Sequence, residues 1–197
     1  MLERYCFVTV GATAAFDALV RAVLDASFLQ ALAKQGYTNI LVQFGKDGRQ
    51  LFTDLAVAIG RNGIYGLKVQ GFDLTRKLRE AMRLTRAEQG RREGIVICHA
   101  GTGSVLDAIR IGVPVIVVPN PTLLDNHQVE FAEQMANMEY AVHGKIDTLL
   151  ESLEKAEELR KKIASRPPVN SGERRQSAGL GAVLDEEMGI EVAGHIE

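Results

Sequence analysis

A loop rich in glycine and hydroxyl residues separates two apolar runs near the middle of the chain. It reads His99-Ala-Gly-Thr-Gly-Ser104 and directly follows the apolar run 95–98. Glycines let a backbone approach a phosphate closely, and the free N–H groups at the start of a following helix favour an anion. Thr102 and Ser104 add hydroxyl donors. The loop fits an anion site, although a structural turn without a ligand stays open. It is neither a Walker A sequence nor a six-residue dinucleotide fingerprint.

Two further polar groups follow the loop. Asp107 comes about one helical turn later, where a carboxylate could accept hydrogen bonds from a ribose diol or simply face solvent. Asp125-Asn-His-Gln128 follows the next apolar run. Asp125 or Asn126 would suit a helix N-cap. His127 and Gln128 are not explained by capping, and they could hydrogen-bond sugar hydroxyls.

The catalytic group of such a site is not evident. His99 is a candidate base and equally a core histidine satisfied by the backbone. No histidine pair has metal-ligand spacing, and no nucleophile elbow is present. An inverting displacement needs only one base and a cradle for the departing diphosphate. The sequence offers the cradle clearly and the base only as a weak candidate.

The elements that must position these residues alternate between strands and helices. Apolar or β-branched runs predict strands at 5–10, 39–44, 65–72, 95–98, 115–118 and 140–143. Helical spacing of apolar residues predicts helices at 16–24, 27–32, 50–59, 126–138 and 146–163, and a further helix that begins at the glycine loop 99–104. Gly112 and Pro114 end the helix that follows the loop. This alternation predicts an α/β fold, a single Rossmann-like doubly wound parallel sheet with ligands beyond the carboxyl ends of its strands.

Composition sets the class of protein. The 197 residues, 46% of them hydrophobic, predict one domain over 1–165 and a flexible tail over 166–197, with a short helix near 183–188. The formal charge of −2 gives no sign of nucleic-acid binding. No apolar stretch reaches the ~18–20 residues of a membrane span. Cys6 and Cys98 fall in buried strands and are expected to be free thiols. With no evident signal peptide, we expect a cytoplasmic protein.

The segment 74–94 is rich in arginine and hard to assign. One interpretation is a solvated helix face with an exposed loop at Gln89-Gly90. The other is a basic surface that faces anionic lipid or a pyrophosphate substrate.

Taken together, the motifs resemble a known family. The motifs are Val8-Thr-Val-Gly11 with Thr13, Phe16-Asp-Ala-Leu19, Gln43-Phe-Gly45, His99 to Ser104 with Asp107, and Val117-Val-Pro-Asn120 with Asp125 to Gln128. They are similar to the catalytic, donor-binding subunits of the two-chain UDP-N-acetylglucosamine transferases of asparagine-linked glycosylation. Those subunits resemble the C-terminal half of lipid-linked GlcNAc transferases of glycosyltransferase family 28, which have the GT-B fold. The resemblance covers roughly residues 5–162.

The resemblance implies a donor site. Gly101 to Ser104 would cradle the diphosphate of UDP-GlcNAc, Asp107 would hold the ribose, and His127 and Gln128 would contact the GlcNAc. The full donor-binding set that it implies is Gly11, Thr13, His99, Gly101, Thr102, Gly103, Ser104, Asp107, Asn120, Asp125, His127 and Gln128.

The resemblance also implies an activity and a partner. The family transfers GlcNAc with inversion to GlcNAc-diphosphate-dolichol at the cytosolic face of the endoplasmic reticulum, without a metal or other cofactor. Because a GT-B active site lies between two Rossmann-like halves and this chain supplies one, a membrane-anchored, acceptor-binding subunit is expected as its heterodimer partner. The isolated chain should then be nearly inactive.

Two segments depart from the family pattern, and they keep other functions open. The arginine-rich segment 74–94 replaces a shorter acidic one, and the tail after Pro167 matches nothing in the pattern. One alternative is a non-catalytic nucleotide-sugar-binding or scaffold module. Another is a subunit of a polysaccharide-synthesising transferase with a different lipid acceptor.

Overall fold

The computed structural model of the chain describes residues 2–60, 63–74, 77–123 and 127–165. Its strands are β1 (Glu3–Thr9), β2 (Asn39–Gln43), β3 (Lys68–Phe72), β4 (Arg91–His99), β5 (Val115–Val118) and β6 (Val142–His143). Its helices are α1 (Asp17–Val23), α2 (Ala26–Lys34), α3 (Arg49–Ile59), α4 (Leu78–Met82), α5 (Thr102–Ile111), α6 (His127–Asn137) and α7 (Leu149–Ala164). Two short 3₁₀ helices, η1 (Arg83–Thr85) and η2 (Ile146–Thr148), precede β4 and α7.

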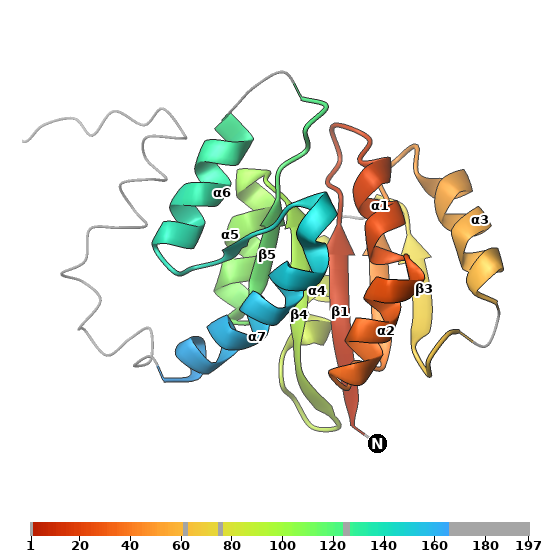
Figure 1. Cartoon of the computed structure of the whole chain (residues 1–197), viewed down its shortest axis with the longest axis horizontal. Coiled ribbons are helices and arrows are strands. Elements are labelled where there is room, and N and C mark those ends of the chain that lie inside the picture. Colours follow the sequence, from red (N-terminus) through yellow and green to blue (C-terminus); the bar gives the residue numbers. More distant parts are fainter. Residues whose placement is uncertain (1, 61–62, 75–76, 124–126, 166–197) are drawn as a thin grey trace, which may run out of the picture. The chain divides into compact units, whose positions relative to one another are not determined.

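The strands form one six-stranded parallel sheet in the order β3-β2-β1-β4-β5-β6 (Figure 1). The chain winds outward from β1 to β3, then returns to the centre and winds the other way from β4 to β6. The order therefore reverses between β1 and β4, and open parallel sheets bind ligands at the carboxyl edge of such a reversal. The predicted α/β fold with a doubly wound sheet is confirmed.

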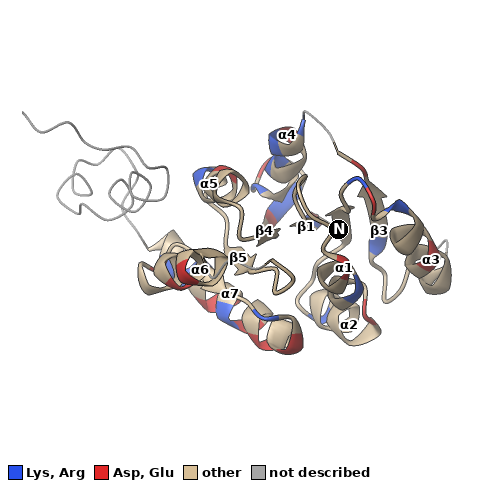
Figure 2. Cartoon of the chain, turned by 90° about the horizontal axis from the view of Figure 1, so that it is seen from above, with Lys and Arg blue, Asp and Glu red and all other residues tan. Residues whose placement is uncertain are grey.

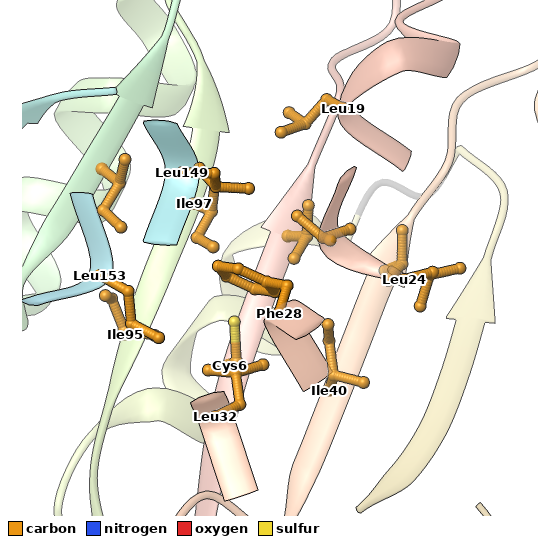
Figure 3. Close-up of a cluster of buried hydrophobic side chains, with 14 of the residues drawn as sticks. Cys6, Leu19, Leu24, Phe28, Leu32, Ile40, Ile95, Ile97, Leu149 and Leu153 are labelled. Atoms are coloured by element: carbon orange, nitrogen blue, oxygen red, sulfur yellow. The ribbon is translucent and has the colours of Figure 1, made fainter. Parts of the chain in front are cut away.

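Helices cover both faces of this sheet. In the view from above, α4 and α5 lie on one side of the strands, and α1, α2 and α7 lie on the other (Figure 2). The second group packs on the sheet through a core that includes Leu19, Phe28 and Leu153, all 0–2% exposed (Figure 3). Burying a side chain of this size stabilises the fold by roughly 1.5–3 kcal/mol.

The central strands are buried on both faces, as their unbroken apolar sequence predicts. All four residues of β5 are buried, and β4 is buried from Gly94 to Cys98. Between them, α5 ends at Gly112, which adopts a left-handed φ of 82° just before Pro114. That stop is the one predicted from the sequence.

Several predicted boundaries were wrong. β4 begins at Arg91 instead of residue 95, because its polar start pairs with Glu3 and Arg4 of β1. β3 begins at Lys68 instead of residue 65, because Ile64 and Leu67 form a tight bridged turn. β6 comprises two residues instead of four.

The arginine-rich segment folds into short pieces. Among the residues of this segment that the structure describes, only α4 and η1 are helical, and the turn at Gln89-Gly90 is exposed. Met82 and Thr85 are fully buried, whereas Leu74 is 45% exposed. The predicted solvated helix with a loop is therefore confirmed in part, with a much shorter helix.

Three further expectations from the sequence concern the two cysteines, membrane spans and the tail. Cys6 and Cys98 are buried free thiols, as predicted, and burial raises the pKa of Cys98 to about 12. None of the helices that the structure describes is both long and apolar enough to cross a membrane. The tail 166–197, with its predicted helix near 183–188, lies outside the described residues.

Candidate functional site

The candidate site lies where β1, β4 and β5 end, at the upper edge of the sheet in Figure 1. β1 leads into Gly11, β4 into the glycine loop at His99, and β5 into Asn120. Because these three strands are neighbours in the sheet, their loops come together although they are far apart in the sequence.

A buried amide holds the loop after β1. Thr9 Oγ1 donates a 2.6 Å hydrogen bond to Gln43 Oε1 at the end of β2. The Gly11 N–H points at the same oxygen (3.3 Å), and Gln43 Nε2 donates to Gly11 O at 3.1 Å. Gly11 itself has a left-handed φ of 84°, which costs a glycine little. The Gln43 side chain thus fixes where the β1 loop turns.

The His99 imidazole lies between two glycines from different loops. A Cβ on Gly11 would come within 2.5 Å of its ring, and one on Gly101 within 2.3 Å of Nε2. Burial lowers the pKa of His99, and a backbone interaction with Thr9 offsets part of this effect. Nδ1 is buried without a hydrogen-bond partner among the residues that the structure describes. The His99 ring is therefore neutral at physiological pH and packs between the two loops.

The start of α5 is open. Its N-cap residue is Gly101, which has no side chain to accept hydrogen bonds from the first N–H groups of the helix. Thr102, Gly103 and Ser104 form the first turn and are partly or fully exposed. A Cβ on Gly103 would meet nothing within 4 Å. At Gly103, therefore, an anion could approach the N–H groups of this helix start without a clash with the described protein atoms.

Asp107 lies further along α5 and is already paired with cations. Its Oδ1 accepts a 2.7 Å hydrogen bond from Arg79 NH2 of α4, and Arg110 NH1 lies 3.7 Å from the same oxygen. The Asp107 side chain is 24% exposed, against 60% for Arg79. The arginine-rich segment thus reaches the predicted ribose-binding carboxylate.

Asn120 connects the loop after β5 to α6 and to the loop after β1. Its backbone N–H donates to Gln128 Oε1 (3.0 Å), and its side chain donates to the Ala15 carbonyl in the loop after β1 (3.1 Å). Its Oδ1 accepts from the backbone and hydroxyl of Thr122. Asn120 is only 5% exposed, so these bonds fix the loop.

The remaining predicted residues are less tightly grouped. His127 opens α6 with a side chain that is 72% exposed and lies 3.8 Å from Glu130. Thr13 is exposed in the loop after β1. Asp125 lies outside the described residues, as does the predicted cap at Asn126. The structure therefore brings Gly11, His99 and Gly101 into contact and leaves Thr13 and His127 open to solvent.

Metal chemistry has no evident centre in the described ranges. No group of three histidine, cysteine or acidic side chains there is arranged to hold a metal ion.

Sequence reasoning missed two residues that shape the site. Gln43 belongs to one of the motifs that resemble the family, but the sequence assigned it no role. Arg79 was one of several arginines in the segment 74–94. A buried polar residue at the end of an apolar strand was the available signal for Gln43, because such a group needs partners. Nothing in the sequence distinguished Arg79 from its neighbours.

Comparison with known proteins identifies the family. Residues 5–178 match the glycosyltransferase family 28 C-terminal domain. UDP-N-acetylglucosamine transferase subunit ALG13 of Yarrowia lipolytica is 40% identical over 128 residues, 65% of this chain and 58% of that relative. Its namesake from Saccharomyces cerevisiae is 33% identical over 162 residues, 70% of this chain and 76% of the relative. The word subunit in these names implies that those relatives act with a partner chain.

Solved structures agree with this placement. The NMR solution structure of ALG13 superposes with a TM-score of 0.61 at 31% identity, over 81% of this chain and 88% of that one. Acinetobacter baumannii MurG superposes with a TM-score of 0.58 at 20% identity, over 82% of this chain and 44% of MurG, which shows the fold alone. The chain belongs to the glycosyltransferase family 28 C-terminal domain family and, within it, to the family of UDP-N-acetylglucosamine transferase subunit ALG13.

Proposed function

We propose that this chain binds UDP-GlcNAc at the ends of β1, β4 and β5. With a membrane-anchored partner, it transfers GlcNAc with inversion to GlcNAc-diphosphate-dolichol. One observation carries the proposal: the uncapped start of α5 lies at the reversal of the sheet, beside loops that His99 holds together. The names of the relatives supply the donor, since each is a UDP-N-acetylglucosamine transferase subunit.

The donor would lie along α5. Its diphosphate would meet the N–H groups and hydroxyls of Thr102 and Ser104, at the positive end of the helix dipole. Its ribose would reach Asp107, and its GlcNAc would lie toward Asn120, His127 and Gln128. Asp125 and Thr13 would border the sugar and the cleft by the same family resemblance.

Transfer is a displacement at the anomeric carbon. The acceptor hydroxyl oxygen bonds to this carbon, the bond to the UDP oxygen breaks, and a base takes the hydroxyl proton. The helix start would stabilise the charge that develops on the leaving diphosphate, so the proposal needs no metal or other cofactor.

His99 does not suit the part of that base. Its Nδ1 is buried, and its Nε2 lies between Gly11 and Gly101, within 2.5 Å of the point where a Cβ of either residue would lie. An acceptor hydroxyl would have to come within about 3 Å of one of these nitrogens. We therefore assign His99 to holding the loops, and the base to a group outside the described site.

The partner and the location complete the proposal. The partner would contribute the acceptor side of the cleft and the membrane anchor, and it would recruit this chain to the cytosolic face of the endoplasmic reticulum. Nucleic acid has no part in it.

Donor binding and transfer test the proposal separately. Calorimetric titration of UDP-GlcNAc into the purified chain should show binding that Asp107→Ala weakens by about tenfold or more, since one charge-assisted contact is lost. Glu154→Gln, an exposed change on α7, is the control. Gln128→Ala should also weaken binding, and its thermal unfolding must be followed because Gln128 holds Asn120.

Transfer is assayed on the complex purified from cells of the source organism. Radiolabelled GlcNAc should pass from UDP-GlcNAc to GlcNAc-diphosphate-dolichol. Donor binding without transfer to any lipid would favour a scaffold module, and transfer only to a different lipid acceptor would favour a polysaccharide enzyme. No binding of UDP-GlcNAc at all would overturn the proposed function.

A further inference from the structure

The ion pair between Asp107 and Arg79 joins the candidate donor site to the arginine-rich segment. Arg79 NH2 lies 2.7 Å from Asp107 Oδ1, within the range of a strong charge-assisted hydrogen bond. Arg110 NH1 approaches the same oxygen at 3.7 Å. Both cations therefore contact the same oxygen of the Asp107 carboxylate. The planar geometry of the carboxylate then fixes the direction of its other oxygen, Oδ2.

This pair contributes little to the stability of the fold. Arg79 is 60% exposed, and exposed ion pairs typically stabilise a protein by only about 0–1 kcal/mol. In Figure 2 the ribbons of α4 and α5 contain blue Lys or Arg positions, and both helices lie on the side of the sheet away from α1 and α2. An exposed arginine that orients a half-buried carboxylate is better placed to act on a ligand than on folding.

A cavity beside the pair has room for part of a ligand. Its volume is about 390 Å³, within the usual range for small-molecule sites. The described residues that line it are Lys77, Leu78, Arg79, Glu80, Arg83 and Asp107. Asp107 is five residues beyond Thr102, or about 7.5 Å along the helix axis. A nucleotide with its diphosphate at the start of α5 would extend along the helix toward this cavity.

We propose that Arg79 is a positioning residue, which orients the Asp107 carboxylate so that it accepts hydrogen bonds from the two hydroxyls of a ribose. This inference rests on the proposed function, in which Asp107 meets the ribose of the donor. Without Arg79 the carboxylate samples other rotamers, and ordering it again costs part of the binding free energy. Arg79 therefore acts through Asp107, and the chain prefers ribonucleotides to deoxyribonucleotides.

Direct attraction of the diphosphate is the competing role for the same arginine. It would also make Arg79→Gln weaken nucleotide binding. The two roles differ in their dependence on Asp107, because long-range attraction persists when the carboxylate is removed and positioning does not.

The experiment is a double-mutant cycle on the full-length chain, read by calorimetric titration with UDP and 2′-deoxy-UDP. The variants are Arg79→Gln, Asp107→Asn and the two combined. Arg86→Gln, which removes an exposed arginine outside the cavity lining, is the matched control. Thermal unfolding of each variant is recorded alongside.

Positioning predicts that Arg79→Gln weakens UDP binding by about tenfold and 2′-deoxy-UDP binding by much less, with an unchanged unfolding temperature. In the Asp107→Asn background the same change should have no further effect, and Arg86→Gln should match the wild type. An equal loss for both nucleotides, or the same loss in both backgrounds, overturns the positioning role. Unchanged binding in Arg79→Gln overturns it too. A wild-type chain that binds neither nucleotide overturns the proposed function, and this inference with it.

Discussion

Two glycines of the loop after β4 have different physical reasons to be glycine. At Gly101 a side chain would collide with the His99 ring, so the protein's own packing requires its absence. At Gly103 a side chain would extend into open space, so nothing in the described protein requires its absence. A ligand that approaches the backbone closely would supply the missing reason.

This difference predicts opposite behaviour for two alanine substitutions. Gly103→Ala should keep or slightly raise stability, because alanine favours a helix by up to about 1 kcal/mol, yet it should weaken UDP-GlcNAc binding at least about tenfold. Gly101→Ala should lower stability by about 1–3 kcal/mol, because the His99 ring must move. Denaturant unfolding and calorimetric titration measure the two effects. Wild-type affinity in Gly103→Ala would contradict the placement of the diphosphate.

At this scale the sequence predicted some of the residues that lie at the ends of β1, β4 and β5, and not what they touch. The glycine loop, Asp107 and Gln128 were found from type and spacing. That Gln128 bonds to the Asn120 backbone, and Asp107 to Arg79, depends on how α6 and α4 pack, which side-chain spacing does not encode.

Among the elements, α7 is fastened to the sheet by a partly buried ionic network. Arg4 of β1 donates two hydrogen bonds to the Glu157 carboxylate of α7, at 2.9 and 3.0 Å. Tyr37 and Arg160 donate to the same carboxylate, at 2.7 Å and 2.9 Å. Arg160 also pairs with Glu93 of β4. The network spans parts of the chain more than 100 residues apart, so the sequence pattern gave no sign of it.

Glu157 should therefore make stability depend on pH. Burial alone would raise its pKa, but hydrogen bonds from Arg160 and Tyr37 and the charges of Arg160 and Arg4 together lower it from 4.5 to about 2. In the unfolded chain the carboxyl keeps its ordinary pKa and binds a proton first as the pH falls. The stabilisation is thus complete above pH 4.5 and is lost as the pH falls toward 2.

Glu157→Gln tests this assignment. It should lower the free energy of unfolding near pH 7 by about 2–3 kcal/mol, because two partly buried arginines lose a charged acceptor. It should also flatten the fall in stability below pH 4.5. Urea unfolding at a series of pH values measures both, with the exposed Glu154→Gln as control. Equal pH profiles for wild type and Glu157→Gln would show that the network does not hold α7.

Element types followed from periodicity better than element ends did. Buried apolar runs located the central strands β1, β2, β4 and β5, because a parallel sheet covered on both faces needs such runs, whereas β3 at one edge is partly polar and not buried. The start of β4 was missed because Arg91 and Arg92 pair with β1 through their backbones, whatever their side chains. The short α4 was overestimated because polar residues in 74–94 carry almost no periodic signal.

For the molecule as a whole, the alternation of elements predicted a doubly wound sheet, and the structure added the order of its strands. That order matters because it places the loops after β1 and β4 side by side at the reversal. The loops form an open edge of the sheet, while a larger hollow of about 690 Å³ lies elsewhere, between α3 and β3. An open edge suits one wall of a cleft whose second wall comes from another domain.

This arrangement predicts that the 197-residue chain binds the donor but transfers GlcNAc very slowly when it is alone. The described residues form one Rossmann-like sheet, which aligns with 44% of MurG. The His99 ring is held between Gly11 and Gly101 with its Nδ1 buried, so we do not expect it to reach an acceptor hydroxyl, and an open site leaves water at the reacting centre. Transfer to GlcNAc-diphosphate-dolichol by the purified chain should therefore stay near background, and adding membranes that hold the partner should restore it. Heat-treated membranes are the control, since they supply lipid without a folded partner. Rapid transfer by the chain alone would mean that it contains its own acceptor site and base.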